Sequence, residues 1–77
     1  MLVTLRYTDV RDSYKNVVIE MEESNEDLEK AFDPFEGKEF TCLSNKGFTK
    51  AVAIAKKYLD SEKKTYKSFS SCEIIRF

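Results

Sequence analysis

The beginning of the chain alternates apolar and polar residues, a pattern that predicts two strands. Over residues 2–8, apolar side chains such as Val3 and Leu5 occupy every second position. This period of two is typical of a strand with one buried face. Residues 14–22 repeat the pattern, and residues 9–13 between them have the composition of a turn. The simplest arrangement is a hairpin of these two strands.

The clearest pattern of the chain is helical and covers residues 47–63. Apolar residues recur there at intervals of three and four, which places them on one side of a helix. Most are small, so this face suits a helix that lies on a sheet. Ser44 or Asn45 would cap its start. The apolar positions are Phe48, Ala51, Val52, Ala55 and Leu59.

Three shorter elements complete the prediction. Residues 24–32 suit a short acidic helix, with Ser24 as its cap and acidic residues in its first turn. The Pro- and Gly-containing run at 33–37 would end this helix and turn the chain. Residues 40–43 then alternate as a third strand, with Phe40 and Cys42 on the buried side that faces the long helix, and residues 72–77 form a fourth strand.

We therefore predict one domain over residues 1–77, in the order strand, strand, short helix, strand, long helix, strand. Because strands and helices are mixed and hairpins are expected, the class is α+β. We expect a small, mostly antiparallel four-stranded sheet with the long amphipathic helix on one face. The opposite face either lies beneath the short acidic helix or forms a docking surface. Its apolar residues are Leu2, Val18, Leu43, Ile75 and Phe77.

No residue pattern points to catalysis, a metal ion or a cofactor. The chain has no histidine, which is the commonest general base. Two cysteines, Cys42 and Cys72, are too few for a structural zinc site, and we expect free thiols packed as small apolar side chains. Gly37 and Gly47 are the only glycines, and neither fits a phosphate-binding loop. We expect a protein that is not an enzyme and that needs no metal and no cofactor.

The sequence also lacks the signals of a membrane protein. No stretch approaches the roughly 20 consecutive apolar residues of a membrane-spanning helix. Arg6 interrupts the first apolar run, which does not fit a secretory signal peptide. We therefore expect a cytoplasmic protein.

Charge is balanced in total but not in place. Residues 20–39 hold nine acidic residues and two lysines, a net charge of −7, while the rest of the chain carries +6. A fold that separates the two sets presents one negative and one positive surface. Such an acidic surface serves solubility, or it occludes a basic site on a nucleic-acid-handling or defence protein, with phenylalanines as anchors. The residues predicted to contact that partner are Glu20, Glu22, Glu23, Glu26, Asp27, Glu29, Phe32, Asp33, Phe35 and Glu36.

Two alternative functions use other surfaces. Lys50, Lys57 and Lys64 recur every seven residues, which spaces them about 10 Å apart along the helix, and Lys46 adds charge nearby. This stripe suits a small nucleic-acid-binding module, although lysine is also the ordinary solvent-facing residue of an amphipathic helix. The other alternative is a homodimer joined through a strand edge or the second sheet face.

The second half of the chain also has a recognisable layout. A strand at Phe40-Thr41-Cys42 precedes the Ala-rich helix from Phe48 to Lys57, and a last strand follows at Cys72-Glu73-Ile74-Ile75-Arg76. This layout resembles small proteins that bacteriophages encode against host systems, anti-CRISPR inhibitors among them. The resemblance implies a stoichiometric inhibitor in the cytoplasm of a host cell. It implies no site residues, because these inhibitors are diverse in fold.

Overall fold

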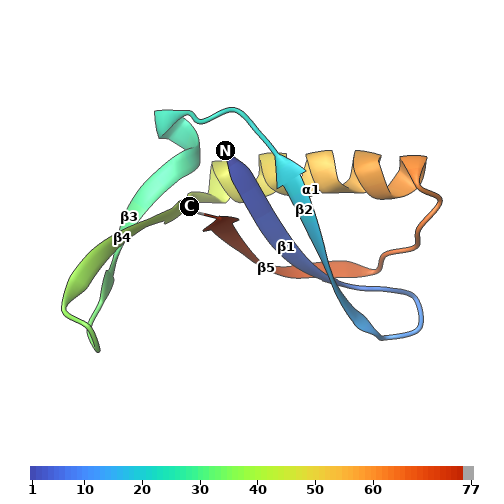
Figure 1. Cartoon of the computed structure of the whole chain (residues 1–77), viewed down its shortest axis with the longest axis horizontal. Helices are drawn as coiled ribbons and strands as arrows, with labels where there is room; N and C mark the ends of the chain where they lie inside the picture. Colours follow the sequence, from blue (N-terminus) through green and yellow to red (C-terminus); the bar gives the residue numbers. More distant parts are fainter. Residues whose placement is uncertain (76–77) are drawn as a thin grey trace.

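A three-stranded sheet and one helix form the body of the molecule in the computed structural model, which describes residues 1–75. The sheet is antiparallel and has the order β2-β1-β5, from β2 (Tyr14–Glu20), β1 (Leu2–Thr8) and β5 (Ser68–Ile75). Helix α1 (Asn45–Ser61) lies along one face of this sheet (Figure 1). The predicted hairpin of the first two strands is confirmed, with Leu5 opposite Val17.

The core lies between the sheet and the helix. Alternate residues of β1 and β2 face the helix, as their period of two predicted. The helix contributes Ala51 and Ala55, both fully buried, so its backbone approaches the sheet closely, and Leu59 fills the far end. The buried core consists of Val3, Leu5, Tyr7, Val17, Ile19, Met21, Leu43, Ala51, Ala55 and Leu59.

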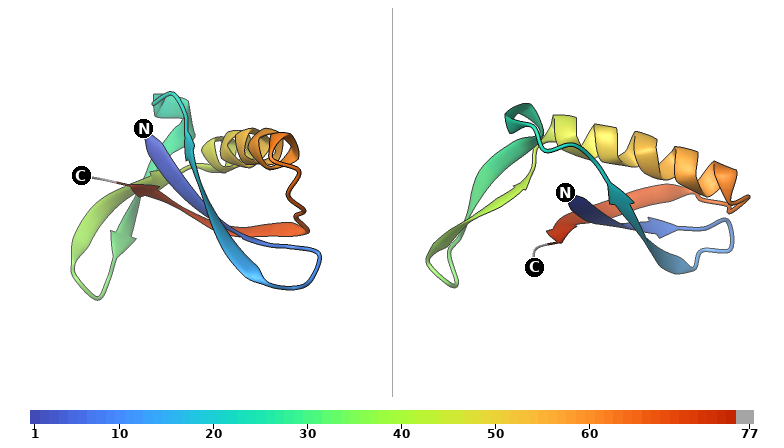
Figure 2. Two further views of the ribbon diagram at one scale, coloured as in Figure 1. Left: turned by 45° about the vertical axis from the view of Figure 1, so that its right-hand side comes forward. Right: turned by 45° about the horizontal axis from the view of Figure 1, so that its top comes forward.

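A second, separate sheet is the main difference from the prediction. Strands β3 (Leu28–Asp33) and β4 (Lys38–Leu43) pair with each other as an antiparallel hairpin. In both views of Figure 2 this hairpin extends beyond the layer formed by the three-stranded sheet and α1. The prediction of a single four-stranded sheet is therefore wrong, because the described residues form five strands in two sheets.

The predicted short acidic helix over residues 24–32 is also wrong. Only one 3-10 turn forms there, η1 (Asn25–Asp27), and strand β3 begins directly after it. The physical reason is the turn at residues 33–37. The Asp33 side chain accepts hydrogen bonds from the backbone N–H groups of Phe35 and Glu36, and Gly37 has a positive φ of 67°. That turn reverses the chain and pairs residues 28–33 with residues 38–43.

The sheet face opposite α1 is open. Val18 is 53% exposed there, so the short helix expected to cover this face does not do so. Leu43, which was assigned to this face, is buried in the core instead. The last strand begins at Ser68, four residues earlier than predicted, and Phe77 lies outside the described residues.

The turn between β1 and β2 is organised by Asp9. The Asp9 Oδ1 atom accepts hydrogen bonds from the backbone N–H groups of Ser13, at 3.0 Å, and Arg11, at 2.9 Å. The bond from Ser13 is the main cause that lowers the pKa of Asp9, although burial opposes it, and Arg11 and Lys15 contribute less. The charged form of this side chain therefore stabilises the folded state.

This lowered pKa predicts an acid-sensitive contribution to stability. A depressed folded-state pKa stabilises the protein above the unfolded pKa, and that stability is lost as the pH falls through the folded pKa. Urea unfolding measured between about pH 5 and pH 2 should show a smaller loss of stability in Asp9→Asn than in the wild type. An equally steep loss in both proteins would show that Asp9 does not contribute.

Candidate protein-binding surface

Three phenylalanines on the β3–β4 hairpin are unusually exposed. Phe32 in β3 is 62% exposed, Phe35 in the turn is 98% exposed, and Phe40 in β4 is 49% exposed. We call these three residues the hairpin surface. Aromatic side chains are enriched in protein interfaces relative to the rest of the surface, so three exposed phenylalanines on one hairpin mark it as a candidate interaction site.

The hairpin surface is distributed over both faces of the hairpin. Phe32 lies opposite Glu39 in the strand pairing, and the neighbouring pair is Ala31 opposite Phe40. Because successive side chains of a strand point to opposite faces, Phe32 and Phe40 lie on opposite faces, and Phe35 lies at the tip between them. A flat partner surface would contact only part of this set, whereas a cleft that receives the hairpin would contact all of it.

Carboxylates accompany these phenylalanines along the hairpin. Glu29, Glu36 and Glu39 are exposed, and Lys30 and Lys38 only partly balance them. Asp33 is different because its side chain holds the turn together through the Phe35 and Glu36 N–H groups. The hairpin thus offers three exposed carboxylates around its aromatic side chains.

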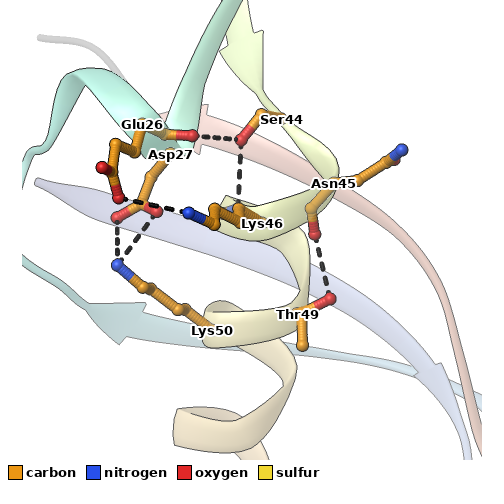
Figure 3. Close-up of polar contacts among 8 residues, drawn as sticks. Glu26, Asp27, Ser44, Asn45, Lys46, Thr49 and Lys50 are labelled. Atoms are coloured by element: carbon orange, nitrogen blue, oxygen red, sulfur yellow. Dashed lines mark hydrogen bonds and ion pairs between the residues drawn. The ribbon is translucent and has the colours of Figure 1, made fainter.

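The remaining acidic residues lie in and around the connection between β2 and η1, apart from the hairpin. Glu20, Glu22 and Glu23 are exposed there. Glu26 forms an ion pair with Lys46, at 3.4 Å, and Asp27 is buried and paired with Lys50 (Figure 3). The acidic segment is therefore two groups of exposed carboxylates, and its expected separation from the helix lysines does not hold at the start of α1.

The start of α1 is held against η1 by backbone contacts around Ser44. Its hydroxyl group donates a hydrogen bond to the carbonyl oxygen of Glu26, at 2.7 Å, and accepts one from Gly47 N–H, at 3.2 Å. Its own N–H donates to the carbonyl oxygen of Asp27, at 2.8 Å. Ser44 is thus the helix cap, one of the two predicted, and it also joins η1 to the helix (Figure 3).

Gly47 allows this close approach, and it gives a testable prediction. A Cβ atom at residue 47 would lie 2.2 Å from the carbonyl oxygen of Asp27, a distance at which the two atoms overlap. The Gly47→Ala variant should lose about 1–2 kcal/mol of unfolding free energy, because overpacking outweighs the better helix propensity of alanine. Thermal unfolding checks this, with Ala53→Gly as a reference for propensity alone. A more stable Gly47→Ala variant would contradict the close contact.

The two cysteines are free and half-buried, as expected of packed thiols. Burial, and to a lesser extent Glu29, raises the pKa of the Cys42 thiol. Burial also raises the pKa of Cys72, with smaller contributions from Cys42 and Glu73. Both thiols are therefore protonated at neutral pH, which disfavours their reaction as nucleophiles.

The lysine stripe of the nucleic-acid alternative is only partly free. Lys46 and Lys50 are engaged by Glu26 and Asp27. Lys57 and Lys64 are exposed. The turn between β1 and β2 and the connection between α1 and β5, which carry further basic residues, lie at the end of the molecule away from the hairpin (Figure 1).

The described residues form neither a metal-ligand cluster nor a membrane-spanning helix. Over residues 1–75, no three Cys, Asp or Glu side chains gather in a way that could hold a metal ion. In the same part of the chain, no helix combines the length and apolar character that crossing a membrane requires.

Comparison with protein-family models, with curated proteins and with solved structures gives no match. The resemblance to phage-encoded inhibitors therefore stays a prediction. What the chain does has to be argued from its own surfaces.

Sequence reasoning found part of the candidate surface. It assigned Phe32 and Phe35 as anchors, and the structure exposes both on the hairpin. It missed Phe40, which it placed on the buried side of a strand. Phe40 and Leu43 point to opposite faces of β4, and Leu43 is the residue of this strand that reaches the core. The alternation along the strand therefore places Phe40 on the exposed face.

Proposed function

We propose that this chain is a non-enzymatic inhibitor that binds another protein through the hairpin surface and the neighbouring carboxylates. The exposure of Phe32, Phe35 and Phe40 on one projecting hairpin is the observation that supports this most. Aromatic side chains are enriched in protein interfaces, and a few of them usually supply most of the affinity.

The partner in this proposal is a protein with a cleft whose rim is basic. The phenylalanines enter the cleft from both faces of the hairpin, while Glu29, Glu36 and Glu39 meet lysine or arginine side chains at its edge. Complementary charge speeds and orients such an association. A cleft of this kind is typical of proteins that handle nucleic acids, and occupying it keeps the nucleic acid out. A phage origin, as the resemblance implies, is part of the same proposal.

The experiment is a pull-down from bacterial lysate with three forms of the chain. The wild type is compared with the triple variant Phe32→Ser, Phe35→Ser, Phe40→Ser and with a control, Val10→Ser, Tyr14→Ser. Val10 and Tyr14 are 59% and 73% exposed, so the control removes exposed apolar area away from the hairpin. We expect one protein, identified by mass spectrometry, to be retained by the wild type and the control and lost with the triple variant.

Two results would contradict the proposal. Equal retention of the captured protein by the triple variant would show that the hairpin surface does not bind it. A wild-type dimer that becomes a monomer in the triple variant, measured by light scattering, would show that the hairpin joins two copies of this chain instead.

A further inference from the structure

A groove runs between the first turns of α1 and the segment that connects β2 to η1. Its volume is about 490 Å³. Helix α1 contributes Lys50, Ala53 and Ile54 to its lining, and the β2–η1 segment contributes Met21, Glu22, Ser24 and Asp27. The lining therefore combines apolar and charged side chains.

Asp27 in the lining of this groove is incompletely hydrogen-bonded. Its side chain is only 3% exposed, and Lys50 Nζ lies 3.1 Å from each of its two oxygens (Figure 3). Only the contact with Oδ2 has the geometry of a hydrogen bond, and Oδ1 is a buried acceptor without one. A buried acceptor without a donor is costly, which makes this carboxylate a poor match for a single ammonium group.

Within residues 1–75, the Lys50 ammonium has a single charged partner, Asp27. The Lys50 side chain is 53% exposed, so its ammonium group can turn into solvent and be hydrated there. Glu22 also lines the groove, so the site attracts a cation whether or not Lys50 occupies it.

We infer that this groove is a binding site for an arginine side chain of the partner protein. The guanidinium group displaces the Lys50 ammonium and donates two parallel hydrogen bonds, one to each oxygen of Asp27. A planar fork matches a carboxylate in this way and an ammonium group does not. The methylene stem of the arginine lies along Met21, Ala53 and Ile54, where it loses contact with water.

This inference rests on the proposed function only for the statement that the arginine belongs to a protein. It adds the chemistry of one contact, since the basic surface of the partner must present an arginine and not merely positive charge. The groove is formed by α1 and the β2–η1 connection, whereas the phenylalanines belong to the β3–β4 hairpin. The two sites can therefore be tested separately.

The test is a titration of the ¹⁵N-labelled chain with N-acetyl-arginine amide, followed by NMR. In the wild type, the largest shifts are expected at the backbone N–H groups of Met21, Ala53 and Ile54. The Lys50→Ala variant should bind the probe more tightly by a factor of about 3–10, because the competing ion pair is gone. Lys57→Ala, an exposed lysine of the same helix without an ion pair to Asp27, should bind like the wild type.

Two further titrations test whether the site prefers a guanidinium group and whether the probe binds in the groove. N-acetyl-lysine amide should bind more weakly than the arginine probe, and equal binding would overturn the assignment of a guanidinium site. Ala53→Phe adds bulk at an exposed position of the groove wall and should abolish the shifts without unfolding the chain. Shifts that persist in Ala53→Phe, or weaker binding by Lys50→Ala than by the wild type, would overturn the inference.

The outcome is independent of the pull-down. The triple phenylalanine variant should bind the arginine probe like the wild type, because its changes are on the hairpin. A failed pull-down with intact probe binding would remove the proposed function and leave the groove, and the reverse result would remove only the groove.

Discussion

Replacing Leu5 with alanine is expected to lower the unfolding free energy by about 2–5 kcal/mol. Leu5 is fully buried at the centre of the three-stranded sheet, paired with Val17 on one side and Cys72 on the other. The change leaves a cavity between the sheet and α1 that the surrounding backbone cannot close completely. A domain of this size has a total stability of about 4–12 kcal/mol, so the loss is a large part of it. Urea unfolding followed by circular dichroism measures the change.

Val18→Ala is the matched control for this prediction. Val18 lies on the neighbouring strand β2 but on the open face, where it is 53% exposed. Its truncation should change the unfolding free energy by less than about 0.5 kcal/mol. If both variants were destabilised equally, the assignment of the buried and open faces of the sheet would be incorrect.

The elements with a strong period were predictable from the sequence. Residues 2–8 and 14–22 alternate clearly, and Ala51, Ala55 and Leu59 of the long helix lie on one side. The structure places these side chains in one core, as a helix on a half-buried sheet requires. Local pattern was sufficient here because each of these elements buries a single, well-defined face.

The β3–β4 hairpin was not predictable in the same way. Leu28, Ala31 and Phe32 have the spacing of a helical edge, and the acidic residues before them suit a helix start. In the structure, most of their side chains do not reach the core, so no buried face fixed the period. The deciding interaction is the pairing of residues 28–33 with residues 38–43 across the Asp33–Gly37 turn. That pairing depends on turn geometry more than on hydrophobic pattern.

The candidate surface was likewise only partly predictable from the sequence. Its charge and two of its phenylalanines follow from composition, but which carboxylates are free does not. Asp27 and Lys50 are 23 residues apart, and they meet only because Gly47 lets η1 dock against the start of α1. A sequence that concentrates acids in one segment thus fixes the charge of the surface and leaves its ion pairs to the tertiary structure.

Removal of the ion pair between Asp27 and Lys50 is the second substitution for which we expect a large loss of stability. Lys50→Ala should lower the unfolding free energy by about 1–3 kcal/mol, because it removes the one cation that residues 1–75 place beside this buried carboxylate. Lys57→Ala, with the same change in helix propensity, should cost little. Both values come from urea unfolding at neutral pH.

A double-mutant cycle separates this ion pair from the other effects of each substitution. If Lys50 stabilises the fold through Asp27, then Lys50→Ala should cost less in the Asp27→Asn background than in the wild type, and the difference is the coupling energy. The coupling should weaken only slightly in about 1 M salt, because the carboxylate is buried and poorly screened. A coupling near zero would mean that Lys50 acts through helix packing alone, and the ammonium group would then not be what the arginine of a partner has to displace.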